Sequence, residues 1–141
     1  MQEITLVKAG LSKGIKVVLR LAKIVIPTII FVSLLQMTTF LNSIGQFFAP
    51  LMQIVGLPGE AAIPFVIGIF TSIYGGIGAM AAISLSPGEL TILSIMISIC
   101  HSAFVESPVV TEGGASATLV FGLRFVGAFL AAWLTHLSGI I

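Results

Sequence analysis

The sequence carries little charge for its size. Of its 141 residues, 6 are lysine or arginine and 5 are acidic, whereas 57% are hydrophobic and the mean hydropathy is +1.21. A soluble domain needs a polar surface, so this composition excludes an ordinary soluble globular protein. The sequence therefore predicts an all-α integral membrane protein. At this length it holds a single domain, and it is shorter than most complete transporters, which are commonly built from two repeated halves.

The sequence also lacks the residue sets of common enzyme and metal sites. The single cysteine, Cys100, excludes a disulfide framework within one chain and lacks the paired spacing of a zinc site. His101 and Ser102 are neighbours that would point about 100° apart on a helix, and no nucleophile elbow is present, so a hydrolase triad is not expected. We therefore expect no enzyme activity, no metal and no cofactor.

Positive charge is concentrated at one end of the chain. Five of the six basic residues would fall within an arc of roughly 140° on a helix; they are Lys8, Lys13, Lys16, Arg20 and Lys23. Such an uneven distribution of positive charge indicates how a chain is oriented in a membrane, and it does not indicate binding to a nucleic-acid polymer. Residues 1–23 are expected to form a basic amphipathic helix on an anionic lipid surface, with the N-terminus in the cytoplasm.

Two apolar segments follow the basic region. Residues 24–41 are roughly 18 residues without a charge, which predicts a spanning helix. Pro27 is expected to bend the chain where the surface helix turns into the bilayer. Residues 43–55 carry an apolar face with helical spacing but are too short to cross, so we expect an interfacial helix there.

Residues 58–85 are apolar but interrupted in their middle by small and polar residues. Each arm has about ten residues, which is half of a membrane crossing. We therefore expect a re-entrant helical hairpin with a tip made of Thr71, Ser72, Gly75, Gly76 and Gly78. Because lipid does not tolerate exposed backbone polar groups, such a tip needs a partner surface.

The stretch HSAFVESPVVTEGG, residues 101–114, places polar residues inside an apolar region. Pro108 disfavours helical geometry at Ser107, so the helix expected over residues 87–112 should break there. Broken helices expose carbonyl and N–H groups near the bilayer midplane, where secondary transporters build their sites. The stretch is therefore expected to form one wall of a solute site.

The carboxylates fall into two groups. Glu60 and Glu89 each follow Pro-Gly in a predicted first helical turn, where a carboxylate complements the helix dipole. Glu106 has no capping role, and an intramembrane carboxylate is a functional candidate, so we expect it to bind a coupling ion, a proton or a substrate group. Glu112 has either the same role or a place at the membrane surface. His101 either binds a proton or substrate or satisfies a freed carbonyl.

The last apolar segment, residues 115–138, is long enough to cross the membrane with some tilt. Gly127 and Ala131 form a stripe of small residues suited to close helix packing. Arg124 lies near the middle of the crossing, where its charge should face a carboxylate, carbonyls or water inside an assembly. We expect these three residues to serve in assembly.

The segment GLPGEAAIPFVIGIFTSIYGGIGAMAAISL, followed by a broken helix, resembles the nucleoside recognition or Gate domain family of small membrane proteins, which includes spore maturation proteins. The hairpin and broken helix are also similar to one repeat of concentrative nucleoside transporters. The resemblance covers roughly residues 15–135. It implies half of an inverted-repeat transporter core, in a bacterial inner membrane. It also implies a substrate site that is formed by Thr71, Ser72, Tyr74 and Gly75 at the tip and by His101, Glu106 and Ser107 at the break.

A single copy lacks the second repeat, so the resemblance implies a second Gate-like chain. The basic N-terminal region favours one orientation, and hence a related partner of opposite topology. A homodimer stays open as well, because Arg124 could pair with Glu106 or Glu112 across it. The sequence thus predicts transport or binding of a small polar solute, with a nucleoside or nucleobase favoured. The alternative is a non-transporting membrane scaffold or regulatory subunit of a partner membrane protein.

Overall fold

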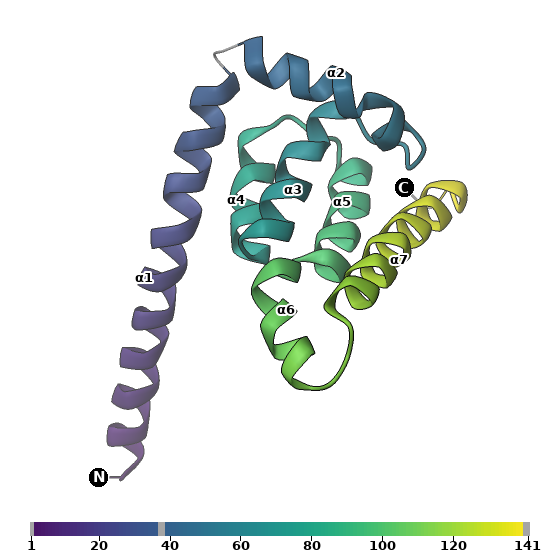
Figure 1. Cartoon of the computed structure of the whole chain (residues 1–141). Helices are drawn as coiled ribbons and strands as arrows, with labels where there is room; N and C mark the ends of the chain where they lie inside the picture. Colours follow the sequence, from purple (N-terminus) through teal and green to yellow (C-terminus); the bar gives the residue numbers. More distant parts are fainter. Residues whose placement is uncertain (1, 37–38, 140–141) are drawn as a thin grey trace.

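The computed structural model describes residues 2–36 and 39–139, and over these residues the fold is helical. Figure 1 shows α3, α4 and α5 side by side, with α2 across one end, α6 beyond the other, α7 slanting past α5, and α1 beside α4. In chain order the helices are α1 (Gln2–Gln36), α2 (Thr39–Gln53), the 3₁₀ turn η1 (Gly59–Ala61), α3 (Ala62–Phe70), α4 (Ile73–Ala82), α5 (Pro87–Cys100), α6 (Ala103–Glu112) and α7 (Ala117–Leu137). The expectation of an all-α fold is confirmed for the described residues.

The first helix, α1, continues through Pro27 without a break. The surface helix expected over residues 1–23 and the first part of the expected spanning helix are therefore one continuous helix, and a bend at Pro27 stays a prediction. Proline removes one helical hydrogen bond, but it fixes φ near the helical value, so a helix held by packing can pass through it. Ala22, Val25 and Ile29 are half-buried, and α1 packs against α4.

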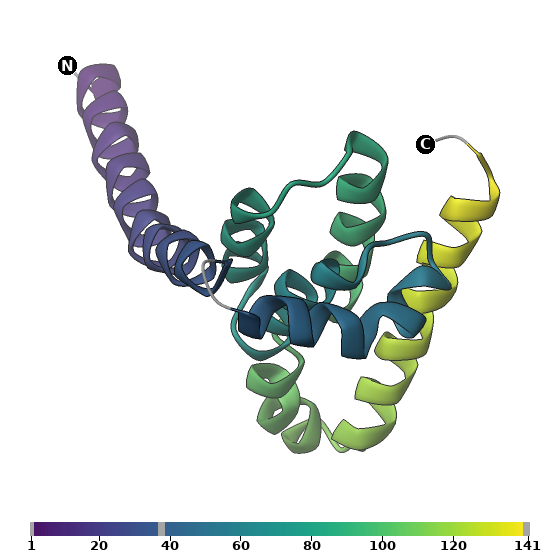
Figure 2. The same cartoon turned by 90° about the horizontal axis from the view of Figure 1, so that it is seen from above.

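The second helix, α2, lies across the end of the bundle, as the view from above shows (Figure 2). It begins at Thr39, earlier than the expected residue 43, and it runs through Pro50. A turn at Gly56, with φ of +73°, then redirects the chain toward η1. A Cβ at Gly56 would overlap the ring of His136 at the end of α7, so this turn requires glycine both for its backbone angle and for space.

The expected helical hairpin is present as α3 and α4, with a link shorter than predicted. Only Thr71 and Ser72 separate the two helices, and the three glycines assigned to the tip lie inside α4. Their role there is close packing. A Cβ at Gly76 would lie 3.3 Å from the Cα of Gly68 on α3 and 3.1 Å from Ile97 Cδ1 on α5. The backbones of the two arms therefore meet directly, and the Ile97 side chain of α5 packs against both glycines.

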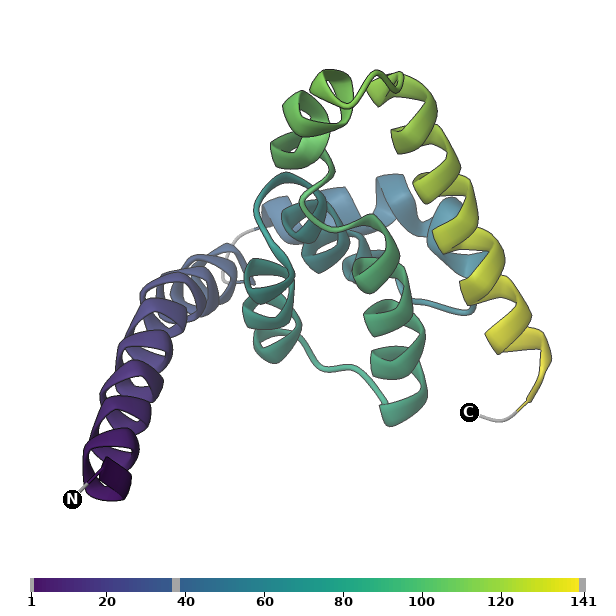
Figure 3. The same ribbon diagram turned by 90° about the horizontal axis from the view of Figure 1, so that it is seen from below.

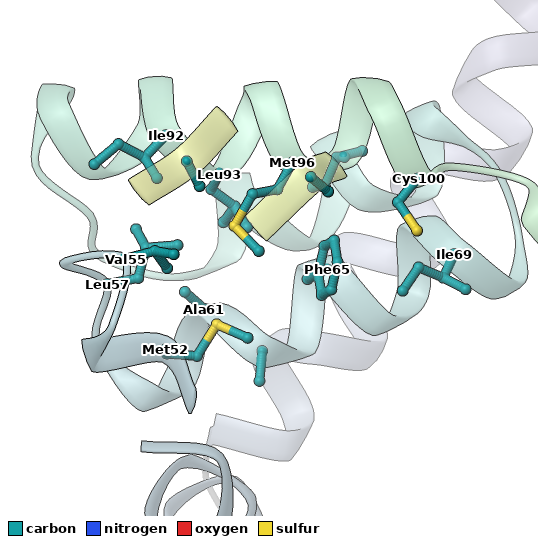
Figure 4. Packing of buried hydrophobic residues seen from close by; sticks show 14 of the residues in the cluster. Met52, Val55, Leu57, Ala61, Phe65, Ile69, Ile92, Leu93, Met96 and Cys100 are labelled. Carbon is teal, nitrogen blue, oxygen red and sulfur yellow. The ribbon is translucent and has the colours of Figure 1, made fainter. Parts of the chain in front are cut away.

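The hydrophobic core lies between α3 and α5 and is closed by the end of α2 and by α7 (Figure 4). Phe65 of α3 sits in it, with ring centroids 6.1 Å from Phe125 and 5.8 Å from Phe129. Ala128 and Ala132 of α7 are completely buried against the cluster. Small residues on α7 thus let this helix approach the bundle while its phenylalanines fill the gap beside α3.

The helix of residues 87–112 is discontinuous, as expected, but the break lies elsewhere. α5 begins at Pro87, as expected, and a capping box of Ser86 and Glu89 holds its start. α5 ends at Cys100, and α6 begins at Ala103 and contains Pro108. The expected break at Ser107 is therefore wrong, because the chain turns at His101 and Ser102, where contacts with the hairpin hold it.

Two segments of the described chain have the length and hydropathy of membrane crossings. α7 has a mean hydropathy of 1.8, and only 11% of its most apolar window is buried, unlike the core helix of a soluble protein. Pro87–Cys100 and Val105–Glu112 pass the same test only together, as a pair bent by 40° that fits a broken span or a re-entrant loop. These properties agree with a membrane location. They leave the re-entrant hairpin and the inverted repeat as predictions.

Candidate functional site

The link between α3 and α4 lies against the break between α5 and α6 (Figure 3). The backbone N–H of Ser102 donates a hydrogen bond of 3.0 Å to the carbonyl oxygen of Gly68. The Ser102 hydroxyl donates a second one, of 3.4 Å, to the carbonyl oxygen of Thr71. The two irregular points of the fold are therefore joined directly, and the polar groups of both gather in one place.

The Thr71 and Ser72 side chains define the link. The Thr71 hydroxyl donates to the carbonyl oxygen of Ile67 at 2.7 Å, one turn back in α3. Ser72 caps α4, because its hydroxyl oxygen accepts from the N–H of Gly75 at 3.3 Å. A Cβ at Gly75 would collide with the Thr71 hydroxyl, so glycine is required here for the link to close. Gly75 thus shapes the site without presenting a side chain to it.

The break depends on Ser102, a residue that the sequence did not single out as a site residue. It has φ of +53° and ψ of 18°, the left-handed conformation that a residue with a Cβ seldom adopts. Its hydrogen bonds to Gly68 and Thr71 are long-range and offset that cost. No local sequence signal marks this position, which is why the break was predicted at Ser107 instead.

His101 lies at the same break with a defined orientation. Its Nδ1 is 2.9 Å from the carbonyl oxygen of Ser98. A carbonyl oxygen only accepts hydrogen bonds, so Nδ1 carries the proton when the ring is neutral and Nε2 is left as an acceptor. The half-buried imidazole is therefore arranged to accept a hydrogen bond from a solute N–H or O–H group.

Glu106 and Arg124 form an ion pair within the one chain. Arg124 Nη1 on α7 lies 2.7 Å from Glu106 Oε2 on α6, and the two side chains are 34% and 39% exposed respectively. The expected carboxylate partner of Arg124 is thus found inside the chain. Glu106 sits one turn after the break, since its N–H donates to the carbonyl oxygen of Ser102. The negative charge of Glu106 is therefore neutralised by Arg124 within the same chain.

The other predicted residues are more dispersed. Ser107 donates its hydroxyl back to the carbonyl oxygen of Ala103 at 2.8 Å, which leaves only its lone pairs for a ligand. Tyr74 is 41% exposed on the first turn of α4, and Glu112 is exposed at the end of α6. Gly127 is half-buried, and a Cβ placed on it would have no atom within 4 Å, so α7 offers open space at this residue.

The polar groups at the link and break carry no net charge. Thr71 and Ser102 offer hydroxyl lone pairs, the Ser72 hydroxyl can donate its hydrogen, and His101 offers Nε2. Such a set matches a neutral solute that has its own donors and acceptors better than it matches an ion. Two surface hollows lie elsewhere, one of about 320 Å³ between α2 and η1 beside Glu60, and one of about 290 Å³ lined by Trp133 and other apolar side chains of α7.

Comparison with known proteins gives two matches. The family model described as "Gate: Nucleoside recognition" matches residues 18–131. Among curated proteins, the uncharacterized membrane protein YvoD of Bacillus subtilis (strain 168) is similar, with 34% identity over 129 residues. The aligned part covers 92% of this chain and 41% of the relative, so the chain spans less than half of that protein. No solved structure matches the chain.

Proposed function

The chain belongs to the Gate family of nucleoside-recognition domains, and from this premise we propose that it binds or transports a small polar solute at the contact between the α3–α4 link and the α5–α6 break. Membership implies a role in nucleoside-related membrane transport at the level of the family. The observation that carries the proposal for this chain is the pair of hydrogen bonds from Ser102 to Gly68 and Thr71. These bonds hold the α3–α4 link against the α5–α6 break, so that the polar groups of both lie at one place.

The favoured solute is a nucleoside or a nucleobase. Such molecules are neutral, and they carry ring N–H groups and hydroxyls or carbonyls that complement the hydroxyls and the imidazole acceptor of the site. The proposed site binds solute and carries out no enzymatic step. Glu106 would serve a coupling ion, a proton or a substrate amine once its bond with Arg124 is opened, and Glu112 remains a second candidate for that role.

The depth of the site supports its use in transport. Helices α3 and α4 have 9 and 10 residues, or about 15 Å each at 1.5 Å per residue, which is half of a hydrocarbon core of about 30 Å. Figure 1 shows that α3 ends and α4 begins near the level at which α5 is followed by α6. A re-entrant hairpin that meets a broken helix near the midplane is the arrangement in which transporters bind their substrates.

A second Gate-like unit would complete the site. Thr71 is exposed at the link, and a polar link at mid-depth needs protein or water over it. The relative from Bacillus subtilis is more than twice as long as the matched region, which leaves room for a second unit in that protein. For this chain we propose a second copy or a related chain, in a bacterial inner membrane with the N-terminus in the cytoplasm.

The alternative function is that of a scaffold or regulatory subunit for another membrane protein. It is favoured by the open space beside Gly127 on α7, in a stripe of small residues with Ala131 that suits close approach of a foreign helix. In that case the polar link would pack against the partner and bind no solute. The two functions differ in what a change at the link does, because only a solute site loses ligand binding while its assembly is kept.

The test uses the protein extracted from the membrane with any partner chain it holds. Its thermal unfolding is followed with nucleosides, nucleobases, amino acids and metal ions in turn. Binding to the folded state alone adds about 2.7 kcal/mol at a ligand concentration of 100 Kd, which shifts the melting temperature by several degrees. We expect a shift with nucleosides or nucleobases, and its loss in a protein carrying Thr71→Val and Ser72→Ala.

Thr91→Val is the matched control. Thr91 is also exposed and donates its hydroxyl one turn back, to the carbonyl oxygen of Pro87 at 2.9 Å, but it lies near the start of α5. It should leave the ligand shift intact. No shift with any solute in the parent protein would contradict the solute site, and loss of assembly in the link variant would then favour the scaffold.

A further inference from the structure

The N-terminal part of α1 stands apart from the rest of the molecule. Figures 1 and 2 show this part extending away from the other helices in two perpendicular views. Every residue from 6 to 20 is exposed, and a Cβ built at Gly10 or Gly14 would have no neighbour within 4 Å. We call residues 6–23 the arm. Nothing in the described part of this chain covers the stretch from 6 to 20.

The arm exposes more apolar surface than a helix in water normally does. Seven large apolar side chains between residues 6 and 20 are between 52% and 71% exposed; they are Leu6, Val7, Leu11, Ile15, Val17, Val18 and Leu19. An uncovered apolar surface of this extent marks a contact site. The two glycines also weaken the helix by about 1 kcal/mol each relative to alanine, so the arm needs a supporting surface to stay helical.

The arm also carries five cations and no anion. Lys8, Lys13, Lys16, Arg20 and Lys23 are all exposed, and the sequence has no acidic residue between Glu3 and Glu60. A second copy of α1 could cover the apolar side chains, but it would bring five more positive charges to the same place. A bilayer surface with anionic headgroups satisfies both features, since the apolar side chains enter the interface and the lysines reach the phosphates.

The length of α1 allows this contact. Its 35 residues span about 52 Å at 1.5 Å per residue, whereas the hydrocarbon core is about 30 Å thick. If the part that packs beside α4 stands in the bilayer, the arm must reach the headgroups or pass beyond them. Pro27, where α1 lacks one backbone hydrogen bond, is the point at which the helix can bend to lay the arm on the surface.

We propose that the arm is a docking surface for anionic phospholipid headgroups. The proposal rests on the exposure and charge of α1 and is independent of the solute site. The arm would fix the depth and tilt of the chain in the membrane. The docking should be stronger on lipid that carries negative charge. Each lysine should raise the equilibrium constant for docking roughly 5-fold, and three lysines about 100-fold.

The experiment places the full chain in nanodiscs of phosphatidylcholine, with or without roughly one third phosphatidylglycerol. A fluorophore that responds to polarity is attached through Leu11→Cys in a Cys100→Ala background. We expect a blue shift and protection from aqueous quencher with phosphatidylglycerol only. The shift should disappear in high salt, because screening weakens attraction between exposed charges.

Charge variants separate the lipid contact from other causes. A triple change of Lys8, Lys13 and Lys16 to glutamine should abolish the shift, while the matched change of the same residues to arginine should keep it. Equal emission in the two lipids would overturn the proposal. So would a shift that appears only when a disc holds two chains, because that result would assign the apolar side chains to a second copy. No solute is present in this experiment, so a negative result here leaves the solute site untouched, and a negative ligand test leaves the lipid contact untouched.

Discussion

At the scale of single residues, the pairing of Glu106 with Arg124 changes how the most prominent carboxylate of the chain is understood. Sequence reasoning treated Glu106 as a ligand and Arg124 as an assembly residue. The structure joins them at 2.7 Å between α6 and α7. Each charge lowers the cost of placing the other away from water, so a change to either residue affects stability as well as binding.

A double-mutant cycle measures this coupling. Glu106→Gln and Arg124→Gln should each lower the melting temperature, because each leaves one partly buried charge unpaired. The double variant should lose less unfolding free energy than the sum of the two single variants. We expect a coupling energy of about 1–2 kcal/mol, which lies between the values typical of exposed and of buried ion pairs. Thermal unfolding of the four proteins in one detergent gives the value. Additive losses would mean that the pair does not hold α6 to α7.

At the scale of secondary-structure elements, the α3–α4 hairpin owes its packing to glycine. Gly68 and Gly76 face each other across the two helices, and Ile97 of α5 lies over both. The same glycines would weaken an isolated helix, since glycine is among the poorest helix formers. The hairpin is therefore built by tertiary contact, and its two arms depend on α5 to stay together.

Alanine at two glycines tests this packing. Gly76→Ala would place its Cβ 3.1 and 3.2 Å from atoms of Ile97 and 3.3 Å from the Cα of Gly68, so we expect a loss of about 1–3 kcal/mol from overpacking. Gly122→Ala on α7 is the control, because no atom lies within 4 Å of its Cβ position and the gain in helix propensity should add about 0.5–1 kcal/mol. In thermal unfolding, Gly76→Ala should therefore lower the melting temperature and Gly122→Ala should raise it. A stabilising Gly76→Ala would refute the close contact.

At the scale of the whole molecule, the arrangement of helices predicts which segments share a side of the membrane. The N-terminus and the α6–α7 turn lie toward one end of the bundle, and α2 and the C-terminal end of α7 lie toward the other (Figure 1). If the basic arm lies on the cytoplasmic side, as the distribution of lysine and arginine favours, we predict that the α6–α7 turn is cytoplasmic as well. The end of α7 is then on the outside.

Three single-cysteine variants in a Cys100→Ala background check this topology. Lys13→Cys and Ala115→Cys should react with a membrane-impermeant thiol reagent only after the membrane is opened, and Ser138→Cys should react in intact cells. Labelling of all three positions from both sides would show that the chain inserts in two orientations, as an antiparallel homodimer requires. The parent protein is the blank, because Cys100 is fully buried.

Much of the fold was predictable because its signals are local. The Pro-Gly before Glu89 predicted the start of α5, where the structure adds a capping box with Ser86. The length and hydropathy of residues 115–138 predicted α7. The interruption between two ten-residue apolar arms predicted the hairpin. Proline was the weak signal, because Pro27, Pro50 and Pro108 all lie inside helices. A missing hydrogen bond is tolerated where surrounding packing holds the helix.

By itself the sequence determined the class of the protein, its helical elements and the polar residue types of the candidate site, because composition and periodicity act through solvation and local backbone preference. Only the tertiary structure decided where the long helix breaks. Ser102 adopts its left-handed backbone because Gly68 and Thr71, more than thirty residues earlier, accept its hydrogen bonds. The same holds for Arg124 and Glu106. Contacts between residues far apart in the chain have no local signature, so folding alone brings these groups together.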